Sequence, residues 1–167
     1  MKERGFDPND IDTLTRLRKL PVFNGMNETQ LAEVLKLARL RQYEEGETVM
    51  RQGEMDQMVH VLIRGECQVS VNDVDVATIS RLGEIFGEMG MVDPMPRSAT
   101  VRALRPTLCL GVDGSFAGRL SGLDQINARG LLYKAFSEIL AERLRRTNAR
   151  ITELEKRLED LAMMPPE

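Results

Sequence analysis

The stretch MVHVLIRGECQVSVND, residues 58–73, decides the fold. Its first part, 58–64, alternates valine and isoleucine with neighbours that are mostly apolar, which predicts a strand buried on both faces. Its second part, 67–72, alternates valine with polar residues, which predicts a half-buried strand. Gly65 separates the two parts, and the pair Asn72-Asp73 follows them as a second reversal.

The same period of two extends over residues 43–112, where short apolar runs are divided by glycines at 46, 53, 65 and 83. Many short strands with frequent turns, uninterrupted by a long helix, are typical of an antiparallel sandwich or barrel. We therefore expect a mainly β domain in the middle of the chain.

Helical periodicity flanks this β region on both sides. Residues 10–42 show apolar spacing of three and four, with Asn27 as a plausible N-cap and Gln30 three positions later. A short helical piece is expected over 115–120. A long helix is expected from about Gln125 to Leu161, and it ends before two prolines.

The most informative motif is GEIFGEMGMVDPMPRSATV, residues 83–101. Gly87 lets the backbone approach a ligand, and the next residues can form one helical turn whose free N–H groups suit a phosphate. Glu88 opens that turn and can accept hydrogen bonds from a diol. Arg97 follows a loop stiffened by two prolines and offers a planar fork for phosphate oxygens, and Ser98 adds a hydroxyl donor. The motif thus suits a sugar phosphate.

This motif resembles the phosphate-binding cassette of cyclic-nucleotide-binding domains. The resemblance covers about residues 10–160. It implies a β jelly-roll with N-terminal helices and a long C-terminal helix. It also implies that Gly87 and Ser98 donate to the cyclic phosphate, that Arg97 pairs with it, and that Glu88 accepts the ribose 2′-hydroxyl. The ligand-contacting set expected from the β domain is Val69, Phe86, Gly87, Glu88, Met89, Arg97, Ser98 and Ala99.

Two features distinguish this cassette within the family. Gly90 and Met91 stand where alanine and leucine are more usual, and glycine loosens a helical turn by ~1 kcal/mol relative to alanine. Ser98 is similar to the residue found in the bacterial catabolite activator family of cyclic AMP receptors. The resemblance therefore implies cyclic AMP as the ligand, with cyclic GMP or cyclic di-GMP as alternatives.

The closing helix carries a heptad pattern. The a positions hold Leu144, Ile151 and Leu158, and the d positions include Leu154 and Leu161. Such a seam favours a helix dimer, and the alternative is packing on the barrel of the same chain. We expect packing on the barrel before residue 140 and dimerisation after residue 151.

By resemblance to the catabolite activators, three residues of this helix join the site. Arg143 matches an arginine near the ribose-binding glutamate. Thr147 would contact adenine in its own subunit, and Asn148 would reach across the dimer. Thr147 also occupies a d position, so a role in setting the register of the coiled coil is an equal alternative.

Several function classes are disfavoured by composition. The net charge of −3 gives no field for DNA, and the arginines at 143–150 alternate with glutamates as on a solvated helix face. His60 is the only histidine, which argues against a metal centre or a histidine-based catalytic triad and indicates a packed strand residue. Cys67 and Cys109 are expected as buried thiols, with a disulfide as the alternative. No apolar run suits a membrane span, so we expect a cytoplasmic protein.

We therefore predict a non-enzymatic, metal-free sensor module. Residues 10–124 would form the cyclic-nucleotide-binding jelly-roll and residues 125–161 the dimerisation and lid helix. Cyclic AMP would alter the helix, the homodimer or an attached effector. A non-binding dimerisation domain is the remaining alternative. The closing helix leads into no helix-turn-helix here, so we expect no nucleic-acid binding by this chain.

Overall fold

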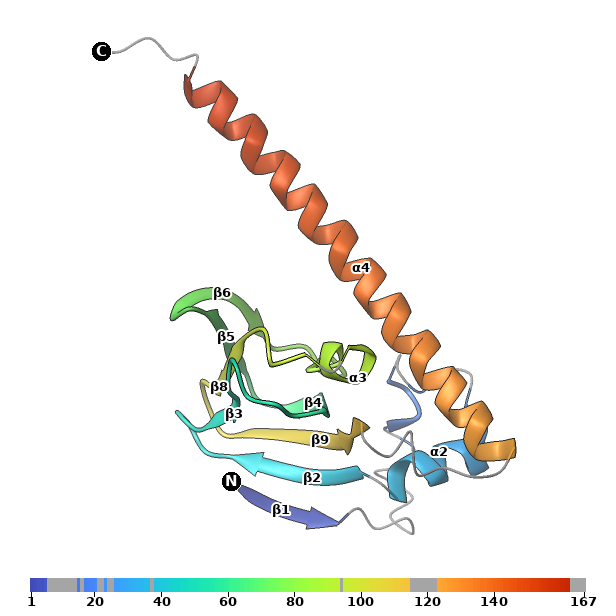
Figure 1. Ribbon diagram of the computed structural model, residues 1–167. Coiled ribbons are helices and arrows are strands. Elements are labelled where there is room, and N and C mark those ends of the chain that lie inside the picture. The colour runs from blue at the N-terminus through green and yellow to red at the C-terminus, as the bar shows by residue number, and fades with distance from the viewer. Residues whose placement is uncertain are drawn as a thin grey trace.

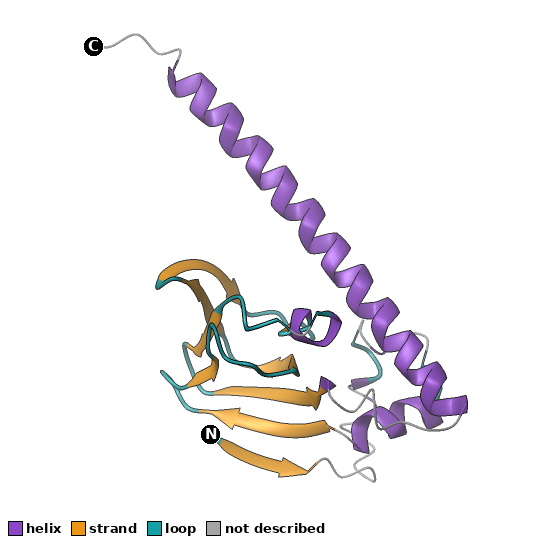
Figure 2. Cartoon of the chain, in the orientation of Figure 1, coloured by secondary structure: helices purple, strands orange, loops and turns teal. Residues whose placement is uncertain are grey.

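The computed structural model describes residues 1–5, 15, 17–20, 23, 26–36, 38–93, 95–114 and 123–162. Two antiparallel sheets form the body of the molecule, and α2 and the beginning of α4 gather at one end of it (Figure 1). Figure 2 shows that strands dominate the middle of the chain and helix its last part. The elements are β1 (Lys2–Gly5), α2 (Glu28–Lys36), β2 (Ala38–Tyr43), β3 (Thr48–Met50), β4 (Met58–Arg64), β5 (Cys67–Val71), β6 (Val74–Ile79), β7 (Ile85–Phe86), α3 (Met89–Val92), β8 (Thr100–Ala103), β9 (Thr107–Asp113) and α4 (Leu123–Ala162).

The two sheets interleave strands that are distant in sequence. The five-stranded sheet has the order β1-β2-β9-β4-β7, and the four-stranded sheet has the order β3-β8-β5-β6. Within this framework β2 pairs with β9 and β5 pairs with β8, always antiparallel. The predicted fold class, an antiparallel β sandwich with flanking helices and a long C-terminal helix, is confirmed.

Strand β4 is buried on both faces over residues 59–62, as the pattern at 58–64 predicts. Val59 and Val61 belong to a core that the sheet shares with α2 and α4. Leu62, one residue out of phase, belongs to a second core between the two sheets. The alternation of strand side chains thus divides one apolar run between two cores.

The predicted cap of the second helix is confirmed. The Asn27 side chain accepts a hydrogen bond from the backbone N–H of Gln30 at 2.9 Å. The Gln30 side chain accepts one from the backbone N–H of Asn27, also at 2.9 Å. This reciprocal capping box satisfies two amides that the first turn leaves unpaired, and α2 begins at Glu28.

Two expectations for the N-terminal region need correction. The helical interpretation of 10–42 is wrong for Ala38–Tyr43, which forms β2, because pairing with β9 outweighs the helical spacing. Strand β1 was not predicted, because Lys2–Gly5 is exposed and polar and has no hydrophobic signal. Pairing with β2 and the ion pair from Glu3 to Arg41 at 2.7 Å hold β1 in the sheet.

Helix α4 begins and ends within two residues of the predicted positions. Leu132 and Phe136 are buried in the core shared with α2. From Leu144 to Leu161 every residue is exposed, and the helix extends away from the sheets (Figure 1). The expected helical piece at 115–120, like residues 10–14, lies outside the described residues.

The predicted turns and thiols are confirmed. Asn72 and Asp73 have φ of 50° and 63°, as a two-residue hairpin turn requires. Gly65 has φ of 109°, and a Cβ there would lie 2.4 Å from the Thr107 hydroxyl oxygen, so no other residue fits. Cys67 and Cys109 are free and buried, and burial raises the pKa of both thiols.

Candidate functional site

The cassette begins where β7 ends. Gly87 follows Phe86 with φ of 80°, a left-handed conformation that favours glycine. A Cβ on Gly87 would lie 2.7 Å from the carbonyl oxygen of Met58. The backbone therefore turns sharply against β4, and Glu88 and the short α3 follow at once.

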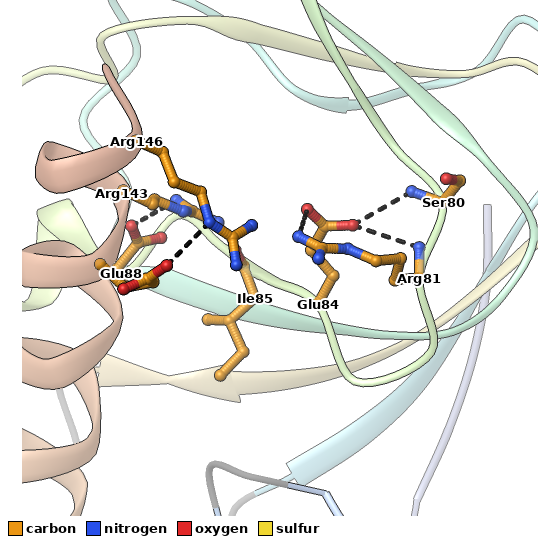
Figure 3. Close-up of polar contacts among 8 residues, drawn as sticks. Ser80, Arg81, Glu84, Ile85, Glu88, Arg143 and Arg146 are labelled. Atoms are coloured by element: carbon orange, nitrogen blue, oxygen red, sulfur yellow. Dashed lines mark hydrogen bonds and ion pairs between the residues drawn. The ribbon is translucent and has the colours of Figure 1, made fainter. Parts of the chain in front are cut away.

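Glu88 links the cassette to α4. Its side chain is 1% exposed, and one carboxylate oxygen accepts a hydrogen bond from Arg143 at 2.5 Å. Arg143 also donates to the backbone carbonyl of Ile85, as Figure 3 shows. The other carboxylate oxygen, Oε2, is buried without a partner among the described residues. A buried acceptor of this kind is a ready position for a ligand hydroxyl.

Arg97 is buried against the same turn. Its guanidinium donates to the Gly87 carbonyl at 2.7 Å, to the Asp56 carboxylate at 2.7 Å and to the Met58 carbonyl. Burial alone would raise the pKa of Asp56, but hydrogen bonds from Arg97 and from the Met58 amide outweigh burial, so this pKa lies below its usual value. The Nε of Arg97 is buried without a partner among the described residues.

Gly90 has a packing role that the sequence did not reveal. A Cβ at this position would lie 2.9 Å from the carbonyl oxygen of Asp56 and 3.0 Å from Nη1 of Arg97. The missing side chain lets α3 lie directly on Arg97. Glycine here thus makes room for the buried guanidinium as well as loosening the turn.

A cavity of about 550 Å³ lies over the cassette. This volume is within the range of about 300–1,000 Å³ that is typical of small-molecule sites. It brings together the predicted residues Val69, Phe86, Gly87, Glu88, Met89, Arg97, Ser98, Ala99, Arg143 and Thr147. Asn148 is exposed and is not among the lining residues, so the cavity of a single chain does not include it.

Sequence reasoning missed several residues of this site. Asp56 lies 41 positions before Arg97, and only the tertiary fold brings the two together. Arg146, labelled in Figure 3, also lines the cavity. It forms an ion pair with Glu142 at 2.9 Å along α4. A signal for Arg146 was present in the sequence, because it follows Arg143 at a helical spacing of three.

Glu84 shapes the loop that leads into the cassette. Its carboxylate accepts hydrogen bonds from the backbone amides of Ser80 and Arg81 at 3.2 and 3.1 Å, as drawn in Figure 3. These contacts fix the reversal between β6 and β7. The direction in which β7 enters the cassette is thereby set.

His60 is a packed strand residue, as predicted. Its ring stacks on Phe86 with centroids 5.0 Å apart, and its Nε2 lies 3.5 Å from the Tyr43 hydroxyl. Burial, followed by the nearby charges of Arg41 and Arg97, lowers the pKa of His60 to about 3. Phe86, the first residue of the cassette turn, therefore rests on a neutral imidazole.

The described residues contain no group of three histidine, cysteine or carboxylate side chains that could hold a metal ion. In that part of the chain, no helix is both long and apolar enough to cross a bilayer.

Comparisons with known proteins agree with this geometry. Residues 40–120 match the family model described as "Cyclic nucleotide-binding domain". A cGMP-dependent protein kinase from Eimeria tenella is 26% identical over 123 residues, which are 73% of this chain and 12% of the kinase. A CRP-like cAMP-activated global transcriptional regulator from Mycobacterium tuberculosis is 25% identical over 142 residues, which are 83% of this chain and 61% of the regulator.

The chain spans between about an eighth and a quarter of the first curated relatives that it matches. Among solved structures, the catabolite activator protein of Thermus thermophilus superposes with a TM-score of 0.66 at 24% identity, covering 81% of this chain and 63% of that one. This structural likeness shows the fold. The matched family model assigns residues 40–120 to the cyclic nucleotide-binding domain family.

Proposed function

We propose that this chain is a cyclic AMP-sensing regulatory module that acts by binding and conformational change, as a dimer joined through α4. The observation that carries the proposal is the pair of buried groups on one cavity wall. Among the described residues, one carboxylate oxygen of Glu88 and the Nε of Arg97 have no hydrogen-bond partner. A ribose cyclic phosphate could donate a hydroxyl hydrogen bond to the Glu88 oxygen and place its phosphate against the Arg97 guanidinium.

The ligand would be recognised by its charge and its sugar together. The 2′-hydroxyl would donate to Glu88, and the cyclic phosphate would bind Arg97 and the hydroxyl of Ser98. The phosphate would then compete with Asp56 for the guanidinium, since Asp56 is the acidic partner of Arg97 in this structure. Binding would thus reach β4 through the loop that holds Asp56.

The signal would leave the site through α4. Arg143 joins the helix to Glu88, so a ligand that engages Glu88 acts on the residue that holds the helix in place. Differential contacts of this kind are what a ligand needs to shift a conformational equilibrium. The exposed heptad seam of α4 supports dimerisation through its last turns.

Thr147 supports adenine as the base of the ligand. Thr147 lines the cavity and offers a hydroxyl, a group that can accept a hydrogen bond from the adenine amino group. Cyclic GMP is the second candidate, because several similar kinases are named as cGMP-dependent. A separate effector protein is a further expected partner, since the regulatory relatives include a cAMP-dependent protein kinase regulatory subunit.

Calorimetric titration with cyclic AMP, cyclic GMP and cyclic di-GMP tests the proposal. We expect one cyclic AMP site per chain and a melting temperature that rises with ligand concentration. A stronger response to cyclic GMP would overturn the choice of adenine. The absence of heat and of thermal shift with every nucleotide would overturn cyclic nucleotide sensing itself.

A further inference from the structure

The outer face of the five-stranded sheet, which packs against α2 and α4, is longer than its helical cover. Leu40 and Leu110 are buried in the core beneath the helices. On the same face, Ile63 and Leu108 are only half-buried. Ile63 lies near the end of β4 and Leu108 near the beginning of β9. Figure 1 shows β9 running from its beginning toward the helical end of the molecule. The apolar surface therefore continues beyond the cover.

A groove of about 640 Å³ lies on this continuation. We name it the sheet-end groove. Its lining residues are Lys2, Glu3, Arg4, Leu40, Gln42, Ile63, Arg64 and Leu108. Its floor is aliphatic, and its rim carries three cations from β1 and β4.

Strand register fixes the spacing of these cations. Lys2 pairs with Gln42, Gln42 with Leu108, and Leu108 with Arg64, so one row crosses four neighbouring strands. Three inter-strand steps separate Lys2 from Arg64, a span of about 14 Å. Arg4 lies two residues from Lys2 on β1 and therefore on the same face of the sheet.

The cations of the groove have no acidic partner among the residues that the structure describes. In the described part of the chain, no ion pair involves Lys2, Arg4 or Arg64. The one acidic residue of the lining, Glu3, points to the opposite face and pairs with Arg41 at 2.7 Å. A concentrated positive rim is notable in a chain with a net charge of −3. Its charge is left for a ligand to neutralise.

We propose that the sheet-end groove binds an acidic, apolar peptide segment of a partner protein. Aliphatic side chains of the peptide cover Ile63 and Leu108, and its carboxylates meet the cations at the two ends of the row. An extended peptide rises about 3.3 Å per residue, so carboxylates four positions apart span about 13 Å and match the row. A membrane surface fits less well, because the apolar residues are recessed and present nothing that inserts between lipids.

The test uses the full chain and a synthetic nine-residue peptide with glutamate at its first, fifth and ninth positions and leucine or valine between them. We expect saturable NMR shift changes at Gln42, Ile63 and Leu108, with the cassette resonances unmoved. The variant Lys2→Glu/Arg64→Glu should weaken binding at least tenfold, because the attractions at both ends of the row become repulsions. Raising the salt from about 50 to 500 mM should weaken binding as well.

Arg51→Glu is the matched control, since Arg51 is an exposed arginine on the loop after β3. It should leave peptide affinity within about twofold of the parent, and the same peptide with lysine for glutamate should not bind. Failure of the acidic peptide to bind at 1 mM would overturn the proposal, and so would binding to anionic vesicles without binding to the peptide. The proposal is independent of cyclic nucleotide sensing, because all variants are expected to keep the parent's response to cyclic AMP.

Discussion

Glu88 and Arg97 share one wall of the cassette cavity but are held differently. Glu88 has one charged partner, Arg143, which comes from α4. Arg97 is held by Asp56 and by two backbone carbonyls. Substitution at either position would therefore remove a proposed ligand contact and also leave a buried protein group without its partner.

We expect Arg97→Ala to weaken cyclic AMP binding by about a hundredfold or more. Truncating one member of a desolvated charge pair typically loses ~2–5 kcal/mol, and 1.4 kcal/mol is tenfold. Glu88→Gln should lose less, because the amide oxygen still accepts from the diol. Ser98→Ala removes a single hydrogen bond to the phosphate and serves as the comparison. It should weaken binding by about tenfold, less than Arg97→Ala.

These affinities are measured by calorimetry, with thermal unfolding of each variant to show that the fold persists. Arg97→Lys separates charge from geometry, because lysine keeps the charge but lacks the planar fork. Binding by Arg97→Ala within threefold of the parent would show that the phosphate lies elsewhere.

His60 gives the fold a predictable sensitivity to acid. Its pKa is about 3 in the folded state against an ordinary value of 6.5, so between these values the unfolded chain binds a proton that the folded chain does not. The free energy of unfolding must then fall as the pH falls, by up to about 1.4 kcal/mol per pH unit from this group. Above pH 6.5 the residue contributes no pH dependence.

We expect His60→Gln to be less stable than the parent at pH 7, because the stack on Phe86 is lost, but to lose less stability on acidification. Urea unfolding at pH 7 and pH 5 measures the difference, and about 2 kcal/mol of the parent's loss should be missing in the variant. Equal losses in both proteins would show that His60 is not buried as a neutral ring.

At the scale of elements, α4 is joined to the cassette at one point and to the core at another. Leu132 and Phe136 anchor its first half beside α2. Arg143 then joins the helix to Glu88 and to the carbonyl of Ile85. Beyond Arg143 the helix is exposed, so this contact is the last that holds it to the described part of its own chain.

We expect Arg143→Ala to loosen α4 from the cassette without unfolding the sheets. Amide hydrogen exchange should rise in the helix from about residue 140 onward and at β7, while exchange in β4 and β9 stays at the parent's rate. Arg145→Ala is the matched control, because in the described part of the chain the ion pair of Arg145 is with Glu142 on the helix surface. Unchanged exchange after Arg143→Ala would show that the core contacts alone hold the helix.

At the scale of the whole molecule, a long apolar stripe is left uncovered. Leu144, Ile151, Leu154, Leu158 and Leu161 are each more than 40% exposed. They follow the heptad pattern of the sequence, and the ion pairs from Glu153 to Arg150 and Arg157 lie along the helix surface. A second copy of α4 would cover the stripe.

We expect Ile151→Asp/Leu158→Asp to convert a sedimenting dimer into a monomer. Ala149→Asp, at the outer f position of the same heptads, adds a charge to the helix and should leave the dimer intact. Linkage requires that if dimerisation changes the affinity for cyclic AMP, cyclic AMP changes the dimerisation constant by the same factor. The cyclic AMP affinity of a monomeric variant would then not depend on protein concentration. If the parent chain sediments as a monomer at all concentrations, the prediction that the heptad seam of α4 forms a dimer is wrong.

The sequence by itself determined the features that depend on local spacing. Alternation at 58–64 predicted a strand buried on both faces, and the spacing of Asn27 and Gln30 predicted a cap. Helical spacing that stops before two prolines predicted the extent of α4. The cassette residues from Gly87 to Ser98 were predictable because the motif is nearly contiguous. In each case a fixed backbone period relates sequence to structure.

Only the tertiary structure decided which distant groups meet. Arg97 contacts Asp56, which lies 41 positions earlier in the chain, and Glu88 contacts Arg143, which lies 55 positions later. Strand β1 and the row from Lys2 to Arg64 exist because β2 and β9 lie between β1 and β4. No local period encodes these partners, because strand order and register are set by burial of the whole sheet between its two cores.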